Sequence, residues 1–254
     1  MNLLAGGRRG GGGDTADMVR ARDELLRLGH LDVISDALAG AVVAGPRAHV
    51  IADAGAGTGH HLSRVLATAP DAHGLALDVS AHAARRAAGA HARIGAVVCD
   101  VWRGLPLGDG VVDVLLNVFA PRNGAEFHRV LAPGGRLVVV TPTPRHLEEL
   151  IAPLGLLTVD GRKPERLAAT LGDRFAEDAA RTIETTITVD RAHVLLLADM
   201  GPSAWHATLA ARAERAERVA RLPDRVAVTV SCRVAIHRPL RPAPRPAAAP
   251  PCGG

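Results

Sequence analysis

Three glycines at alternate positions, in the stretch ADAGAGTGHH, are the first residues whose spacing could serve a ligand. Gly55, Gly57 and Gly59 allow sharp backbone turns and close approach of a ligand, and Asp53 precedes them. Thr58 lies between the last two glycines, and no lysine follows them, as a phosphate-binding P-loop would require. The spacing G-x-G-x-G also differs from the G-x-G-x-x-G of dinucleotide sites. The loop alone therefore leaves the ligand open.

Three polar side chains further along the chain follow apolar runs. Asp78 could accept both ribose hydroxyls of an adenosine, and Asp100 could accept from an adenine amino group. Asn117 ends the next apolar run. Open α/β sheets bind ligands at the carboxyl ends of their strands, so we expect these side chains to lie near the glycine loop.

The elements that must position these residues alternate between apolar runs and helical segments. Short apolar strands that alternate with helices predict parallel strands joined by crossovers, with both faces of the sheet covered. We therefore predict an open, mostly parallel α/β sheet with helices on both faces. The expected strands are 49–54, 73–78, 95–100, 111–119 and 136–142, and the expected helices between them are 61–69, 81–90 and 124–131.

The flanking segments carry weaker patterns. We expect helices from Asp14 to about Leu28 and over 32–39, 146–150, 164–171, 190–197 and 208–221, and further strands over 185–190 and 225–237. The predicted organisation is a flexible segment (1–13), one α/β domain (14–240) and a disordered Pro/Ala-rich tail (241–254). Within the domain we expect a cofactor-binding core over about 45–145 and acceptor-side elements over about 146–240.

The composition of the chain indicates which cofactors, partners and cellular location to expect. Among the 254 residues, three cysteines lie far apart and no run of about 18 apolar residues occurs, so we expect no disulfide framework, metal site or membrane partner. No signal peptide opens the chain, which makes the cytoplasm the expected location. The formal net charge is +4 and Lys163 is the sole lysine. Arginine suits phosphate recognition, but the codon bias of a GC-rich genome explains this excess equally well.

Taken together, the loop, the strand-end residues and the turn Pro133-Gly134-Gly135 resemble the class I methyltransferases, a Rossmann-like family that binds S-adenosylmethionine. The resemblance places Asp53 and the glycine loop along the methionine part and the ribose. It makes Asp78 the ribose acid, Asp100 the adenine contact and Asn117 a further cofactor-site residue. The segment Asn117-Val-Phe-Ala-Pro departs from the Asn/Asp-Pro-Pro-Tyr/Phe of enzymes that methylate an adenine amine.

The flanking motifs are more specific. DTADMVRARDELLRLGHL, LNVFAPRN, VVVTPTPRHLEEL and ADMGPSAWHA resemble the 23S ribosomal RNA (guanine-N(1)-)-methyltransferases, including actinobacterial macrolide-resistance members. The resemblance implies a ribosomal RNA hairpin as substrate and a homodimer. It also places Leu31 and His146 near the cofactor and 200–205 at the acceptor cleft. Simpler roles exist, because Leu31 could be core and His146 could cap a helix. Trp102 and Trp205 are expected in the core rather than as platforms for bases.

Methylation of guanine at N1 requires removal of the ring proton. Asn117 can accept a hydrogen bond but cannot take a proton, whereas His146 or a water molecule could. The sequence therefore leaves the catalytic base unassigned. A methyltransferase acting on a small metabolite, or a non-catalytic binding module with the same fold, remains an alternative.

The resemblance begins at about Asn2, whereas family members carry an N-terminal zinc ribbon that helps to hold the RNA. We therefore expect that Met1 is a misplaced start and that a ribbon with paired cysteines lies upstream. The glycine-rich stretch after Met1 would then be an interdomain linker.

Overall fold

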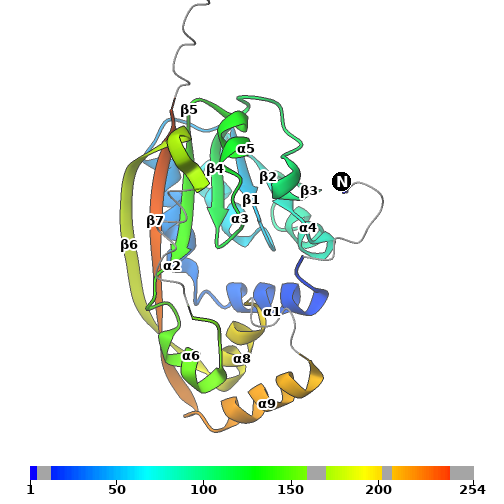
Figure 1. Ribbon diagram of the computed structural model, residues 1–254, viewed down its shortest axis with the longest axis vertical. Coiled ribbons are helices and arrows are strands. Elements are labelled where there is room, and N and C mark those ends of the chain that lie inside the picture. The colour runs from blue at the N-terminus through cyan, green and yellow to red at the C-terminus, as the bar shows by residue number, and fades with distance from the viewer. Residues whose placement is uncertain (5–12, 159–169, 202–207, 241–254) are drawn as a thin grey trace, which may run out of the picture.

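A seven-stranded sheet forms the centre of the protein in a computed structural model that describes residues 1–4, 13–158, 170–201 and 208–240. The strand order is β3-β2-β1-β4-β5-β7-β6 (Figure 1). Strands β1 to β5 pair in parallel, whereas β7 is antiparallel to β5 and β6. The strands are β1 (Val50–Ala54), β2 (His73–Asp78), β3 (Ile94–Val98), β4 (Val112–Val118), β5 (Leu131–Pro142), β6 (Phe175–Asp190) and β7 (Arg225–Pro239).

Helices join the parallel strands, and several begin at side-chain caps. Thr15, Ser80 and Asn123 each accept a backbone N–H of the first turn, which satisfies a donor that the helix itself cannot. The helical elements are α1 (Ala16–Arg27), α2 (Asp32–Val43), α3 (His60–Thr68), α4 (Ala81–Ala88), η2 (Val101–Arg103), α5 (Gly124–Val130), α6 (Glu148–Leu154), η3 (Gly172–Arg174), α8 (Arg191–Asp199) and α9 (Leu209–Ala220).

Two hydrophobic cores lie on opposite faces of the sheet, because successive side chains of a strand point to opposite sides. In β4, Val114 and Leu116 belong to one core, with Leu62 of α3. Leu115 belongs to the other, with Phe127 of α5. Helices therefore cover both faces, which confirms the predicted fold class.

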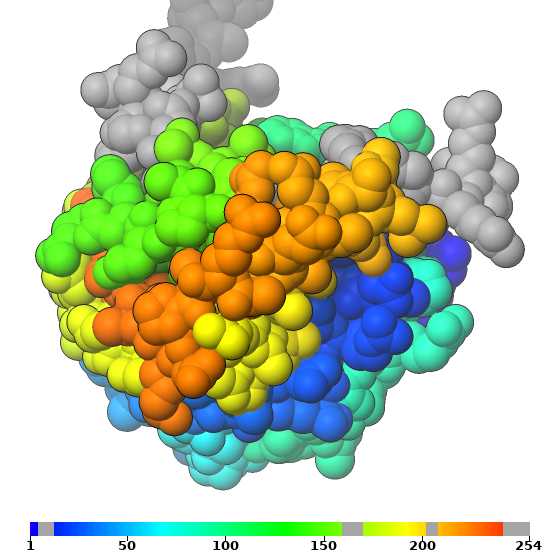
Figure 2. All heavy atoms as spheres, turned by 90° about the horizontal axis from the view of Figure 1, so that it is seen from below, coloured from blue at the N-terminus to red at the C-terminus, as the bar shows by residue number. Residues whose placement is uncertain are grey.

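Four helices lie across the end of the sheet at which β1 to β5 terminate. Helices α1, α6, α8 and α9 occupy this end (Figure 1), and seen from below they form much of the surface (Figure 2). Polar contacts join them, since Arg215 of α9 pairs with Asp199 of α8 over 2.9 Å. This layer closes over the strand ends where a ligand is expected.

Most predicted elements are present with small changes at their boundaries. The largest correction concerns β6, which begins at Phe175 although the sequence predicts a strand over 185–190 alone. Its first half is exposed and charged, so it carries no apolar alternation, and pairing with β7 defines the strand. The helix expected over 146–150 is displaced to α6, and most of the helix expected over 164–171 lies outside the described residues.

The first four residues differ from the flexible segment expected there. Asn2 forms a parallel bridge with Val98 of β3, and Leu3 donates its backbone N–H to the Val98 carbonyl over 2.9 Å. These residues extend the sheet beyond β3. In the described part of the chain, no helix is both long and apolar enough to cross a bilayer.

Candidate active site

The glycine loop joins β1 to α3 and crosses the carboxyl end of β2. The amides of Gly55 and Ala56 both donate to the Leu77 carbonyl, over 2.8 Å and 3.1 Å. Gly55, Gly57 and Gly59 have φ angles of 84°, 54° and 75°, in the left-handed region that side chains disfavour. The backbone can turn here because glycine alone takes these conformations at little cost.

Close packing adds a second requirement for glycine in this loop. A Cβ atom on Gly55 would lie 2.3 Å from the Cβ of Ala120, in the segment after β4. A Cβ on Gly59 would lie 2.9 Å from the Cα of Ala87 in α4. The loop is therefore fitted between the end of β4 and α4.

Asp78, the last residue of β2, holds the glycine loop. Its Oδ2 accepts the backbone N–H of Gly57 over 2.8 Å, and its Oδ1 accepts that of Ser80 over 2.8 Å. Burial raises the pKa of Asp78, and these two backbone N–H groups act in the opposite direction. Each carboxylate oxygen can accept a second hydrogen bond, so the side chain retains capacity for ribose hydroxyls.

Asp53 is buried at the end of β1, with 2% of its surface exposed. Burial, together with the charge of Asp78, raises the pKa of Asp53 to about 7. Within the described part of the chain its Oδ1 has no hydrogen-bond partner. A buried carboxyl of this kind fits a cationic ligand group, since a nearby positive charge would favour its ionised form.

Two neighbouring buried side chains also present polar atoms without partners among the described residues. These atoms are Oδ1 of Asn117 and Oγ1 of Thr58. The Asn117 amide donates to the carbonyls of Ala54 and Pro121, over 3.0 Å and 2.9 Å, and so ties the end of β1 to the segment after β4. Buried polar groups are normally satisfied, so these atoms together with Asp53 indicate a site for a polar ligand.

Asp100 follows β3 and caps the short helix η2. Its Oδ1 accepts the backbone N–H of Trp102 over 3.0 Å, and its Oδ2 lies 3.6 Å from Nε of Arg103. Asp100 therefore has a capping role, and the adenine contact stays a prediction. Trp102 was expected in the core, but it is 64% exposed, which corrects that expectation.

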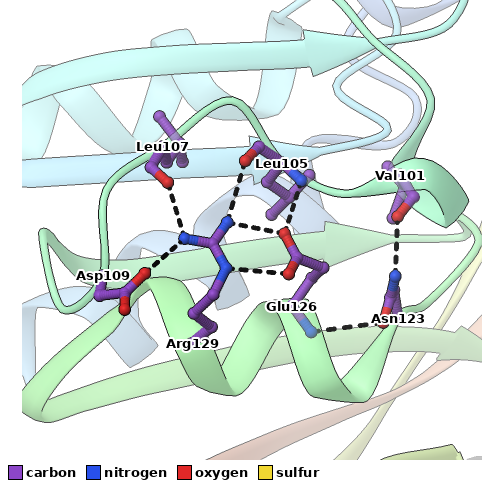
Figure 3. A network of polar contacts seen from close by, with 7 residues as sticks. All are labelled: Val101, Leu105, Leu107, Asp109, Asn123, Glu126 and Arg129. Carbon is purple, nitrogen blue, oxygen red and sulfur yellow. Dashed lines mark hydrogen bonds and ion pairs between the residues drawn. The ribbon is translucent and has the colours of Figure 1, made fainter.

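A polar network in α5 fixes the segment after Asp100 (Figure 3). Arg129 donates to the carbonyls of Leu105 and Leu107 and pairs with Glu126 and Asp109. The hydrogen bond and charge of Arg129 lower the pKa of Glu126, whose Oε2 also accepts the Leu105 N–H over 2.7 Å. These contacts hold Leu105 and Leu107 against α5, and Asn123 donates to the carbonyl of Val101, the residue after Asp100, over 3.1 Å (Figure 3).

Leu31 and His146 were both expected near the cofactor. Leu31 is 2% exposed and packs in the hydrophobic core, so its contact with a cofactor stays a prediction. His146 follows β5, where its Nδ1 accepts the backbone N–H of Ser231 over 3.3 Å. Its ring lies beside that of Phe119, with 5.5 Å between centroids.

The two histidines after the glycine loop make local contacts. Nδ1 of His61 lies 2.8 Å from the Ser35 hydroxyl. Burial, together with the charges of His60 and Arg22, lowers the pKa of His61 to about 3. His61 is therefore neutral at physiological pH. Nε2 of His60 lies 3.5 Å from an Asp32 carboxylate oxygen.

Sequence reasoning missed Arg22, which reaches the loop from α1. Its guanidinium pairs with Asp14 and donates to the Met200 carbonyl over 2.7 Å. A Cβ atom on Gly57 would lie 3.4 Å from its Nη1. The signal that could have found it is its place on the buried face of α1, four residues after Met18. Trp205 lies outside the described residues, and so does most of the segment 200–205.

Known proteins resemble this chain in sequence and fold. Residues 51–135 match the family described as "Methyltransferase domain". Two solved structures share the fold: geranyl diphosphate methyltransferase (TM-score 0.51, 18% identity, 94% of this chain and 96% of that one) and the YcgJ protein of Bacillus subtilis (TM-score 0.51, 12% identity, 82% and 98%). The class I methyltransferase fold is thereby confirmed.

Curated relatives cover most of the chain. The 23S rRNA (guanine(748)-N(1))-methyltransferase of Streptomyces fradiae is 46% identical, over 89% of this chain and 81% of its own length. A provisionally named 23S rRNA (guanine-N(1)-)-methyltransferase of Micromonospora griseorubida is 49% identical, over 94% and 85%. Identity of this extent over most of both chains leads to one assignment: the chain belongs to the 23S rRNA (guanine-N(1)-)-methyltransferase family.

Proposed function

We propose that this protein transfers the methyl group of S-adenosylmethionine to N1 of a guanine in 23S ribosomal RNA. The observation that carries the proposal is the 46% identity with an enzyme named for N1 methylation of guanine 748, over most of both chains. The loop and strand-end residues of the candidate site support it, because they offer the polar groups that such a cofactor requires.

The chain's own residues would bind and orient the cofactor. When bound, S-adenosylmethionine would supply an electrophilic methyl carbon for in-line attack by guanine N1, with the carbon–sulfur bond breaking and S-adenosylhomocysteine leaving. Asp53 and the Oδ1 atom of Asn117 would hold the ammonium of the methionine part, while Asp78 would accept the ribose hydroxyls and Asp100 the adenine amino group. Such positioning of two reactants can supply roughly 7–11 kcal/mol of the barrier.

The N1 proton of guanine must leave as the methyl group arrives. The position of His146 argues against a role as the base, because its Nδ1 already accepts the Ser231 N–H. With that hydrogen bond in place, the neutral ring carries its proton on Nε2. We therefore propose that a water molecule accepts the N1 proton of guanine, and that His146 orients the guanine by hydrogen bonding.

The family relationship also supports proposals about the RNA substrate, the cellular location, the oligomeric state and the biological effect of methylation. The substrate would be a ribosomal RNA hairpin, the enzyme would act in the cytoplasm as a homodimer, and methylation would protect the ribosome against a macrolide. Expression in a macrolide-sensitive actinobacterium should raise the inhibitory concentration of the drug. Sedimentation of the purified protein should give twice the chain mass.

The test of the main proposal is methyl transfer to RNA in vitro. Purified protein is mixed with methyl-tritiated S-adenosylmethionine and with protein-free 23S rRNA, 16S rRNA or a panel of small phenols and amines. Label should enter 23S rRNA alone, and mapping should place it on N1 of one guanine. RNA affinity should fall steeply with added salt, because arginine–phosphate contacts release counterions.

Two results would contradict the proposal. Transfer to a small phenol or amine without transfer to RNA would assign the protein to small-molecule metabolism. Tight binding of S-adenosylmethionine without transfer to any acceptor would indicate a non-catalytic module.

A further inference from the structure

Phe119 has an unusual backbone conformation at the end of β4. Its φ angle is 52°, in the left-handed region, where a bulky residue is an outlier. Although it follows a strand whose last five residues are buried, its side chain is 41% exposed. A strained conformation persists only where the surrounding structure holds it in place, and such conformations cluster at active sites and ligand sites.

The neighbouring contacts fix the backbone on both sides of Phe119. Its own N–H donates to the Val140 carbonyl over 3.1 Å, which joins it to β5. Two residues earlier, Asn117 donates to the Pro121 carbonyl over 2.9 Å and closes the turn. The ring is therefore held at a defined place, where glycine would take the same backbone conformation at less cost.

The ring of Phe119 contacts His146, the residue expected near the cofactor. It lies beside the His146 ring, with an interplanar angle of 38°. The next residue, Ala120, is the one that a Cβ on Gly55 would strike at 2.3 Å. Phe119 is thus one residue from the contact with the glycine loop, and it lies at the carboxyl ends of β4 and β5, where such sheets place their ligands.

We propose that Phe119 is the surface on which the acceptor guanine stacks, with His146 at its side. This inference rests on the proposed function. A half-exposed aromatic ring, held against strain one residue from the contact with the glycine loop, provides a flat apolar face. Purine bases stack on such faces in single-stranded RNA sites. A packing role for the ring explains neither its exposure nor the left-handed backbone.

The test compares Phe119→Leu, which removes the ring but keeps apolar bulk, with Phe119→Tyr, which keeps the ring. For each variant, calorimetry gives the affinity for S-adenosylmethionine, and initial rates give kcat/KM for 23S rRNA. Phe119→Leu should lower kcat/KM by about 10- to 100-fold while the cofactor affinity changes less than about threefold. Phe119→Tyr should keep most of the wild-type kcat/KM, because it keeps the aromatic ring.

A third variant, Phe119→Gly, separates the ring from the backbone strain. It should raise the melting temperature, since glycine accepts the left-handed conformation, and yet show the same loss of kcat/KM as Phe119→Leu. The inference is overturned if Phe119→Leu methylates RNA as well as the wild type does. It is also overturned if the affinity of Phe119→Leu for S-adenosylmethionine falls by the same factor as its kcat/KM. A wild-type protein that methylates no RNA refutes the proposed function itself, and this inference with it.

Discussion

The backbone N–H of Gly57 donates to Oδ2 of Asp78 over 2.8 Å, which joins the glycine loop after β1 to the end of β2. The same carboxylate accepts the Ser80 N–H, so one side chain orders the segments after both strands. An acid expected only to hold the cofactor therefore also builds the loop that receives it.

Replacement of Asp78 by alanine should weaken binding of S-adenosylmethionine by roughly 1.5–3 kcal/mol, the range for hydrogen bonds to a charged group. The matched control is Asp113→Ala, because Asp113 accepts the N–H groups of His49 and Val50, over 2.7 Å and 2.9 Å, at the opposite end of the parallel strands. Calorimetry should show weaker binding for Asp78→Ala alone. Equal affinity for S-adenosylmethionine in both variants would show that Asp78 does not bind the cofactor.

Gly55→Ala should destabilise the protein and abolish cofactor binding, because its new Cβ would strike Ala120. Gly134→Ala is the matched control: its φ of 85° is close to the 84° of Gly55, but its Cβ would meet nothing within 4 Å. Both variants carry the left-handed cost of about 1–2 kcal/mol. Steric overlap should add about 1–3 kcal/mol at Gly55, measured by denaturant unfolding. Equal losses at the two positions would contradict the close packing.

The raised pKa of Asp53 predicts a pH dependence of stability. Its folded pKa of about 7 exceeds the reference value of 3.8, so between these values the folded state binds more protons than the unfolded state. Stability should therefore fall as the pH rises from about 4 to about 7, by up to about 4 kcal/mol, and change little from this source above pH 7. Asp53→Asn should remove this slope and be the more stable protein at pH 8. Parallel stability curves for the two proteins would contradict the shift.

The same group should couple cofactor binding to pH. If the ammonium of S-adenosylmethionine lies beside Asp53, binding favours the ionised carboxylate and releases a proton between about pH 5 and pH 7. Calorimetry in buffers of different ionisation enthalpy measures that release, which Asp53→Asn should abolish.

Arg129→Met should destabilise the protein by about 1–3 kcal/mol, because it removes the Arg129 donor of the Leu107 carbonyl and the cation that pairs with the Glu126 carboxylate. Arg47→Met is the control: the Arg47 side chain is 68% exposed and pairs with Asp71 over 2.6 Å, and such surface pairs contribute about 0–1 kcal/mol. Thermal unfolding should separate the two variants. A loss in Arg129→Met no larger than in Arg47→Met would show that the network of Figure 3 does not stabilise the fold.

Local sequence patterns predict the succession of the parallel strands along the chain and the place of the polar residues at their ends. Apolar runs alternating with helices, and glycines at alternate positions, are local patterns that short-range sterics and burial impose. Those patterns alone suffice to locate Asp53, Asp78 and Asn117 at one end of a sheet. The flanking motifs led to the family, which the 46–49% identical relatives confirm.

Contacts between segments far apart in the chain complete the site, and the sequence patterns do not predict these contacts. The length of β6 depends on its pairing with β7, since its exposed first half has no pattern of its own. Arg22 reaches the glycine loop because α1 lies across the strand ends, a placement made by contacts with α4 and α8. The left-handed backbone of Phe119 follows from hydrogen bonds to β5 and across the turn. Such features depend on contacts between residues far apart in the chain, which local propensity does not encode.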